Sequence, residues 1–323
     1  MAQAPSTSRK PKSRPHFEGM APLSPRSMLF TLFGDYAYPT GEDVSLGGLI
    51  RLAQPLGVSE AAVRSAVARL ARRGWLAARR CGTRSHYGLT GAGRTLIAEG
   101  TQRIYGPHSG TWSGKWCLLT YSIPESRRSL RDRMRKRLAW LGFGALGGGA
   151  YISPRPVEQR VDGLLEAHGV GRYAKIFTAA LAGPGSDEEL ARRCWDLAAI
   201  AERYERFVSH YAPLQRRDVI RLGFAKLSDD KAFAARFALT HDFRRFPYID
   251  PDLPPVLLPK DWAGGRARRL FEDYHDALAP GALRHFRRCC AAAQKPNVRA
   301  APSPDSRRRR DPLCAPAAPP SRI

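Results

Sequence analysis

The apolar positions between Val58 and Leu76 predict one amphipathic helix with defined ends. They recur at the three- and four-residue spacing of a single buried helix face, at Val63, Ala66, Val67 and Leu70. Ser59 has the side chain of an N-cap, and Gly74 is suited to a left-handed stop. Polar and guanidinium groups are left on the outer face, and the helix is about as long as one groove crossing. The pattern is typical of a DNA-recognition helix.

The flanking pattern completes a winged helix-turn-helix over residues 25–106. One helix is expected over residues 25–36 and a second over residues 45–55, with buried positions at Met28, Leu29, Leu32, Phe33, Leu46, Leu49, Ile50 and Leu52. After Gly74, two short strands over 75–80 and 85–89 surround the tip Cys81–Arg84 and form a wing. A fourth helix reaches Tyr105.

A second region, residues 115–183, shows the order β-α-β-α-β. Strands are expected at Trp116–Ile123, near Ala150–Ser153 and at Tyr173–Leu181, with a basic helix at Ser126–Leu141. This order favours a small ferredoxin-like domain. Residues 184–290 predict a mostly helical C-terminal domain, with one long helix over Ser186–Tyr211 that links domains or pairs two protomers, and a Pro-rich turn near 250–259. The predicted fold class is α+β.

The strong positive charge of the chain indicates a polyanionic binding partner. The formal net charge is +24, which attracts any polyanion: nucleic acid, an anionic membrane or an acidic partner. An arginine-rich compositional bias accounts for part of the excess but not for its clustering beside the helix-turn-helix. Nucleic acid is the favoured partner. Residues 1–24 and 291–323, the latter with the run Arg307–Arg310, read as disordered basic arms.

The sequence contains no pattern typical of a zinc site, a disulfide framework or a membrane segment. The six cysteines form no CxxC pair or regular framework, which argues against zinc and disulfides and fits a reducing cytoplasm. The longest apolar run near the N-terminus, Met28–Phe33, is too short for a membrane span or signal segment. We therefore expect no cofactor, no metal and no membrane.

Two short motifs match functional patterns, but the sequence around them argues against a dinucleotide-binding loop and against a metal site. Gly142–Gly147 matches the string GxGxxG but follows a helix and precedes a strand, the reverse of the order that cradles a dinucleotide. A tight helix-to-strand turn explains its glycines.

His241 and Asp242 are adjacent in the sequence, and no further His or Cys stands at the spacing of a metal ligand. The basic helix over 127–137 either binds phosphates or is a solvated face, and the latter is favoured. No enzyme is predicted.

The DNA-contacting residues follow from the helix geometry. Residues near the start of a recognition helix enter the major groove first, which assigns base edges to Ser59, Ala61, Arg64 and Ser65. Backbone phosphates are assigned to Arg69, Arg72 and Arg73 and to the wing residues Arg79, Arg80 and Arg84. The alternative for the wing is a set of solvated arginines on an exposed hairpin.

Separate blocks in a fixed order make the chain resemble the PaaX family, transcriptional repressors of phenylacetic-acid degradation operons. The blocks are Pro25–Ser27 with Leu32–Tyr36, Gly57–Ser59 with Gly74–Leu76, Tyr87–Thr90, Leu141–Gly144 with Ile152–Pro154, His241–Pro247, Asp250–Pro255 and Leu258–Trp262. The resemblance spans residues 25–285. It implies a winged helix-turn-helix, a Cas2-like ferredoxin domain and a family-specific C-terminal domain.

The resemblance also implies function. Such proteins act as homodimers on palindromic double-stranded operators and release them when an aryl-CoA thioester, typically phenylacetyl-CoA, binds. An acyl-CoA needs cations and an apolar slot, which His241, Arg244 and Arg245 offer beside Phe243, Phe246 and Tyr248; the alternative is that this motif only packs the C-terminal domain. Two other functions stay open: a Cas2-like nuclease, although the first strand ends in Tyr121-Ser122-Ile123 without a carboxylate, and a nonspecific architectural protein.

Overall fold

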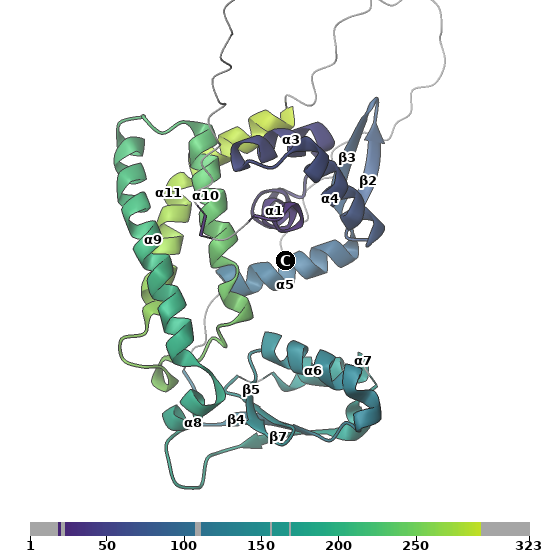
Figure 1. The fold of residues 1–323 in the computed structure, drawn as a ribbon, viewed down its shortest axis with the longest axis vertical. Coiled ribbons are helices and arrows are strands. Elements are labelled where there is room, and N and C mark those ends of the chain that lie inside the picture. Colours follow the sequence, from purple (N-terminus) through teal and green to yellow (C-terminus); the bar gives the residue numbers. More distant parts are fainter. Residues whose placement is uncertain (1–18, 21–22, 107–110, 156, 168, 292–323) are drawn as a thin grey trace, which may run out of the picture.

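The computed structural model describes residues 19–20, 23–106, 111–155, 157–167 and 169–291. The predicted arms over 1–24 and 291–323 lie almost entirely outside these ranges. The described chain forms three regions: an N-terminal helical region with a hairpin, a four-stranded sheet with helices, and a set of long helices alongside both (Figure 1).

The N-terminal region begins with α1 (Pro25–Leu32), whose first turn is capped by Ser24. The helix continues as a π-helical turn (Phe33–Ala37) and α2 (Tyr38–Thr40), and it ends at Gly41. The sequence predicted an end at Tyr36. After α3 (Leu46–Ala53) and a 3-10 turn (Gln54–Leu56), the predicted recognition helix is α4 (Glu60–Arg72).

Both predicted ends of α4 are present. The Ser59 hydroxyl accepts a hydrogen bond from the Ala62 N–H at 3.4 Å, and Gly74 is left-handed with φ +71°. The Trp75 N–H then bonds to the Leu70 carbonyl at 3.1 Å, which closes the helix end. The four predicted apolar positions are the buried residues of α4. Local sequence therefore determines this helix and its direction of burial.

A three-stranded sheet follows the helix-turn-helix. The wing pairs β2 (Leu76–Cys81) with β3 (Arg84–Leu89) around Gly82 and Thr83, as predicted to within one residue. The third strand, β1 (Val44–Ser45), pairs with β3 and was not predicted, because two residues are too few to show a period. Helix α5 (Gly91–Tyr105) completes the winged helix-turn-helix.

The middle region has one more strand than predicted. Its elements are β4 (Trp116–Tyr121), α6 (Arg128–Trp140), β5 (Gly144–Gly147), β6 (Ala150–Ser153), α7 (Glu158–Ala167) and β7 (Ala174–Ala179). The antiparallel sheet has the order β5-β6-β4-β7. The β-α-β-β-α-β order is the ferredoxin-like arrangement. Strand β5 escaped prediction because its sequence, Gly-Ala-Leu-Gly, has no strand propensity.

In the 142–147 motif, Gly142 makes a turn and Gly144 allows close packing, which agrees with the interpretation that this is a helix-to-strand turn and not a phosphate-binding loop. Gly142 turns the chain from α6 toward β5 with φ +86°. A Cβ on Gly144 would lie 2.6 Å from the Trp195 ring, so only glycine lets β5 approach this indole.

The C-terminal region contains α8 (Asp187–Cys194), α9 (Leu197–Gly223), α10 (Asp229–Phe243) and α11 (Ala263–Ala291). The single helix predicted over Ser186–Tyr211 is wrong, because Trp195 is extended and Asp196 starts a new helix by capping the Ala199 N–H at 3.0 Å. Helix α9 also runs past Tyr211 to Gly223. Among the described residues no helix combines the length and apolar character needed to cross a membrane.

The winged helix-turn-helix shares its hydrophobic core with the C-terminal helices. Phe233 and Phe237 of α10 and Phe286 of α11 are buried in the same cluster as Met28, Leu49 and the apolar face of α4. The predicted domain limits at 106/115 and 183/184 stay predictions. Because close-packed side chains transmit displacement, a shift of α10 or α11 would move the helices of the helix-turn-helix that share this core.

Candidate nucleic-acid interface and ligand pocket

The predicted DNA-contacting residues lie in α4, at its two ends and in the two strands of the wing. Nine are exposed and Arg84 is half-buried: Ser59, Ala61, Arg64, Ser65, Arg69, Arg72, Arg73, Arg79, Arg80 and Arg84. Arg64, Arg69 and Arg79 are among the arginines of this set that have polar partners. Arg64 binds Glu60 with 2.8 Å between Nε and Oε1, Arg69 donates to Ser65 at 2.8 Å, and Arg79 pairs with Asp43 at 3.5 Å.

A cleft of about 350 Å³ lies between α3, α4 and the wing. Arg64 of α4 and Arg84 of the wing line it, together with Ser45 at the end of β1 and Gly47 at the start of α3. Arg51 of α3 adds a third guanidinium that the sequence analysis did not assign. The available signal was that Arg51 is the one charged residue of the predicted second helix. A cleft with three cations suits a phosphate backbone.

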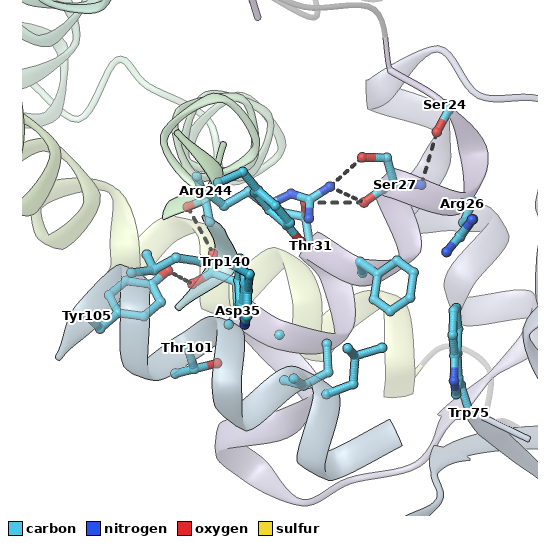
Figure 2. A pocket seen from close by; sticks show the side chains of 18 residues that line it. Ser24, Arg26, Ser27, Thr31, Asp35, Trp75, Thr101, Tyr105, Trp140 and Arg244 are labelled. Carbon is cyan, nitrogen blue, oxygen red and sulfur yellow. Dashed lines mark hydrogen bonds between the residues drawn. The ribbon is translucent and has the colours of Figure 1, made fainter. Parts of the chain in front are cut away.

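A second cavity, of about 430 Å³, lies where the three regions meet (Figure 2). It is lined by α1, α5, the end of α6 and the end of α10. Most of its wall is apolar or aromatic, from Phe30, Trp75, Leu96, Ile97, Trp140 and Tyr248. Two cations, the exposed Arg26 and the half-buried Arg244, also line it, and the Arg26 guanidinium lies 5.2 Å from the Trp75 ring centre. This composition is typical of a small-molecule site.

The structure separates the three predicted effector residues. Arg244 lines the 430 Å³ cavity and bonds to the carbonyl oxygen of Ser27 at 3.3 Å and to its hydroxyl (Figure 2). Arg245 lines a different cleft of about 360 Å³, with Arg203 and Arg206.

His241 lines neither of these cavities. Its ring is buried, with Nδ1 3.1 Å from the Thr31 hydroxyl. Burial, with the charges of Arg244 and Arg245, lowers the pKa of His241 to about 3, so it is neutral at pH 7. It therefore cannot offer a cation to a phosphate.

A buried carboxylate network borders the cavity and was missed by the sequence analysis. Asp35 of the π-helical turn lies 3.2 Å from the Arg236 guanidinium and 3.0 Å from His275 Nε2, and it accepts from the Tyr105 hydroxyl at 3.0 Å. Burial acts to raise the pKa of Asp35, but His275 and Arg236 hold it below its usual value. The Asp35 side chain thus connects the π-helical turn after α1 to α5, α10 and α11.

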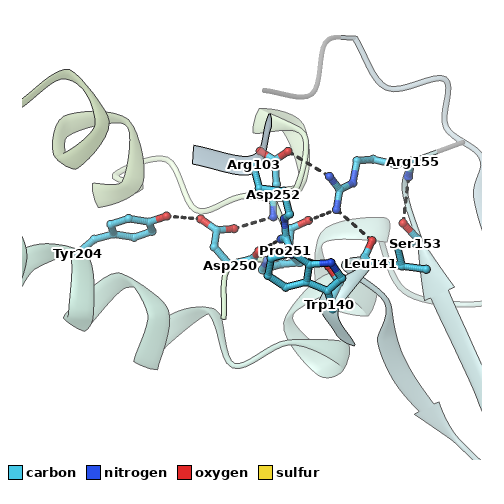
Figure 3. Close-up of polar contacts among 9 residues, drawn as sticks. All are labelled: Arg103, Trp140, Leu141, Ser153, Arg155, Tyr204, Asp250, Pro251 and Asp252. Carbon is cyan, nitrogen blue, oxygen red and sulfur yellow. Dashed lines mark hydrogen bonds and ion pairs between the residues drawn. The ribbon is translucent and has the colours of Figure 1, made fainter. Parts of the chain in front are cut away.

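A second polar junction holds the middle region against α5 and the loop after α10 (Figure 3). Arg155, beyond β6, donates to the carbonyls of Leu141 and Pro251 at 3.2 and 3.0 Å and pairs with Asp252 at 3.3 Å. Arg103 of α5 donates to the Trp140 carbonyl and, at 3.1 Å, to that of Asp250. These bonds connect all three regions next to Trp140, which lines the 430 Å³ cavity.

Comparisons with known proteins agree with this architecture. Three family models match in order: PaaX-like protein over residues 24–93, the PaaX central Cas2-like domain over 109–191, and the PaaX-like C-terminal domain over 195–288. The chain belongs to the PaaX family. The transcriptional repressor PaaX of Escherichia coli (strain K12) is 35% identical over 271 residues, which are 83% of this chain and 84% of that protein.

A solved structure shares the fold. The uncharacterized protein Rv0674 from Mycobacterium tuberculosis matches with a TM-score of 0.54 and 21% identity, over 81% of this chain and 98% of that one. At this identity the likeness concerns the fold alone. Among the residues that the structure describes, no group of three or more His, Cys, Asp or Glu side chains could hold a metal ion.

Proposed function

We propose that this PaaX-family chain represses an operon for a phenylacetate-type aromatic pathway and is released from its operator by an aryl-CoA thioester. The observation that carries the proposal is the aromatic-lined cavity that Arg244 also lines, placed between the helix-turn-helix and the rest of the molecule. The similarity to a PaaX repressor supports the DNA-binding role. The protein would act in the cytoplasm as a homodimer on a palindromic site.

The test is binding to its own promoter DNA and to scrambled DNA at fixed salt, with and without phenylacetyl-CoA. We expect specific binding that the thioester abolishes, with two chains per site when the complex is sized by light scattering. Specific binding indifferent to the thioester would remove the effector but keep the regulator. Equal affinity for both DNAs would favour an architectural protein, and metal-dependent nicking would favour a nuclease.

In this proposal DNA is read by the start of α4 and held by the arginines around it. Ser59, Ala61, Arg64 and Ser65 face base edges, and the remaining arginines of α4 and the wing bind phosphates. The Glu60–Arg64 pair is more than half exposed on both sides, so its loss on DNA binding costs little.

Arg64→Ala is expected to relax sequence preference, whereas Arg72→Ala is expected to weaken binding to all DNA alike. The first should cost about 1 to 3 kcal/mol on the operator, and the second should lower the slope of log affinity against log salt by about 1. Titrations of operator and scrambled DNA at several salt concentrations measure both quantities. Unchanged discrimination by Arg64→Ala would refute its assignment to base edges.

Release follows if the ligand replaces contacts that hold the helix-turn-helix in its DNA-binding arrangement. The cavity already contains such a contact, Arg244 on Ser27 of α1. An acyl-CoA that draws Arg244 to its own oxygens, with the aryl group among Trp75, Phe30 and Trp140, would break this link. The ligand must prefer the released arrangement, because equal affinity for both would shift nothing.

Arg244→Gln is expected to raise the phenylacetyl-CoA concentration for half-release by about tenfold or more, because a charge-assisted hydrogen bond contributes about 1.5 to 3 kcal/mol. Glutamine still offers a donor to Ser27, so DNA binding without ligand should persist. Arg245→Gln is the matched control in the other cleft and should leave release within about twofold. A loss of response in Arg245→Gln but not in Arg244→Gln would move the site to that cleft.

A further inference from the structure

The ligand cavity and the proposed DNA surface meet at one side chain, Trp75. Its backbone is fixed directly after α4, because its N–H donates to the Leu70 carbonyl at 3.1 Å and its carbonyl accepts from the Thr90 N–H at 3.2 Å. Its indole packs against Phe30 of α1, with 5.3 Å between ring centres, and lines the 430 Å³ cavity. Trp75 therefore joins the end of the predicted recognition helix to the wall of the cavity.

Two guanidinium groups contact this indole. Arg26 of α1 lies 5.2 Å from its ring centre, and Arg73, directly after α4, lies 5.6 Å from it. Both arginines are exposed. Arg26 lines the cavity, whereas Arg73 belongs to the proposed DNA surface. The two cations are therefore separated by about one Debye length or less, which is roughly 10 Å at about 0.1 M salt.

The Arg26 side chain is oriented by aromatic rings and open to an anion. Its guanidinium stacks over Trp75 and, at 5.7 Å, over Phe30. Within the part of the chain that the structure describes, it makes no hydrogen bond or ion pair. Stacking on a ring leaves the N–H donors at the edge of the guanidinium free, and their fork matches two oxygens of a phosphate.

The exposure of the two cationic side chains of the cavity indicates how an aryl-CoA thioester would be oriented. Arg244 is half-buried, whereas Arg26 is exposed. In Figure 2, Arg26 and Trp75 lie at one end of the cavity and Tyr105 lies at the other. Removing a phosphate from water is costly, whereas removing an aryl group is favourable. The aryl group therefore belongs inside the cavity, and the phosphates belong beside Arg26.

We propose that Arg26 binds the phosphates at the nucleotide end of the effector, and that these phosphates repel DNA held by Arg73. The inference rests on the proposed function. A ligand phosphate at Arg26 and a DNA phosphate at Arg73 lie about one Debye length apart, so screening by salt removes only part of their repulsion. The nucleotide end of the effector thus strengthens ligand binding and weakens DNA binding, whatever the DNA sequence.

The test compares phenylacetyl-CoA with S-phenylacetyl-N-acetylcysteamine, a truncated thioester that keeps the acyl group and has no phosphate. Calorimetric titration of the full-length protein without DNA measures both affinities. We expect Arg26→Gln to weaken binding of phenylacetyl-CoA about tenfold or more, as the loss of a charge-assisted contact does, and to leave the truncated thioester within about twofold. Arg94→Gln, at an exposed arginine of α5 outside the cavity wall, is the matched control and should change neither affinity.

Three results would overturn the phosphate contact. The first is an unchanged affinity of Arg26→Gln for phenylacetyl-CoA, and the second is equal weakening of both ligands, since the truncated thioester has no phosphate to lose. The third concerns DNA in the absence of ligand. If Arg26 held a DNA phosphate instead, Arg26→Gln would lower the slope of log affinity against log salt by about 1, whereas we expect the wild-type slope.

The repulsion has a measurement of its own. At saturation, phenylacetyl-CoA should lower the affinity of the wild-type protein for operator DNA by a larger factor than the truncated thioester does, and added salt should narrow the difference. Equal factors would overturn the repulsion. A wild-type protein that binds neither thioester would instead count against the proposed function, so the two failures are distinguishable.

Discussion

Asp35→Ala is expected to lower the free energy of unfolding by about 3 to 5 kcal/mol, because it leaves the Arg236 guanidinium buried without its counter-charge. The side chains of both residues are less than a tenth exposed, and they lie 3.2 Å apart. The same substitution removes the acceptor of Tyr105 and the partner of His275. Urea unfolding at pH 7 measures the loss.

Asp276→Ala is the matched control for this experiment. Asp276 also approaches His275, at 3.5 Å, but its side chain is 85% exposed, so its loss should cost at most about 1 kcal/mol. Equal effects of the two substitutions would contradict the importance assigned to the buried ion pair. Since the pKa of Asp35 is lowered, its contribution is complete at neutral pH and is lost only as pH falls through its folded-state pKa, below about 3.9.

His241 is expected to make the protein less stable as the pH falls from about 6.5. Its pKa in the folded protein is about 3, so between these values the unfolded chain binds a proton that the folded protein does not. Each pH unit in this window costs about 1.4 kcal/mol, which amounts to about 2 kcal/mol between pH 6.5 and pH 5. Unfolding titrations at a series of pH values measure this slope.

His241→Gln should reduce the slope while leaving a polar side chain beside Thr31. His210→Gln, on α9 and partly exposed, is the control that should retain it. The pKa of His285 is also lowered by burial, so His285 contributes in the same direction. We therefore expect the His241→Gln variant to keep a smaller slope of the free energy of unfolding against pH. A wild-type slope in His241→Gln would show that the histidine is not buried in its neutral form.

Prediction from sequence succeeded where the information is local. The period of Val63, Ala66, Val67 and Leu70, the cap at Ser59 and the stop at Gly74 defined α4 nearly to the residue. It failed where local signals are weak. Strand β1 has two residues and β5 is half glycine, and the apolar period continues across the break at Trp195.

The two candidate sites differ in how far they could be predicted from the sequence. The outer face of α4 and the wing could be listed from the sequence, because a helix face and a hairpin are set by nearest neighbours. The cavity could not, since Trp75, Trp140 and Arg244 come together only when three regions pack. The motif around residue 241 illustrates the limit: adjacent residues 244 and 245 point into different clefts, and residue 241 into the core.

By itself the sequence determined the winged helix-turn-helix, the ferredoxin-like middle region, the family and the basic character of the chain, because each depends on short-range periodicity, caps, composition or ordered motifs. Only the tertiary structure decided that the helix-turn-helix shares a core with α10 and α11, that Asp35 pairs with Arg236, and that Arg51 of α3 binds the end of α11. These contacts join residues some 200 or more positions apart, and no local pattern records such a pairing.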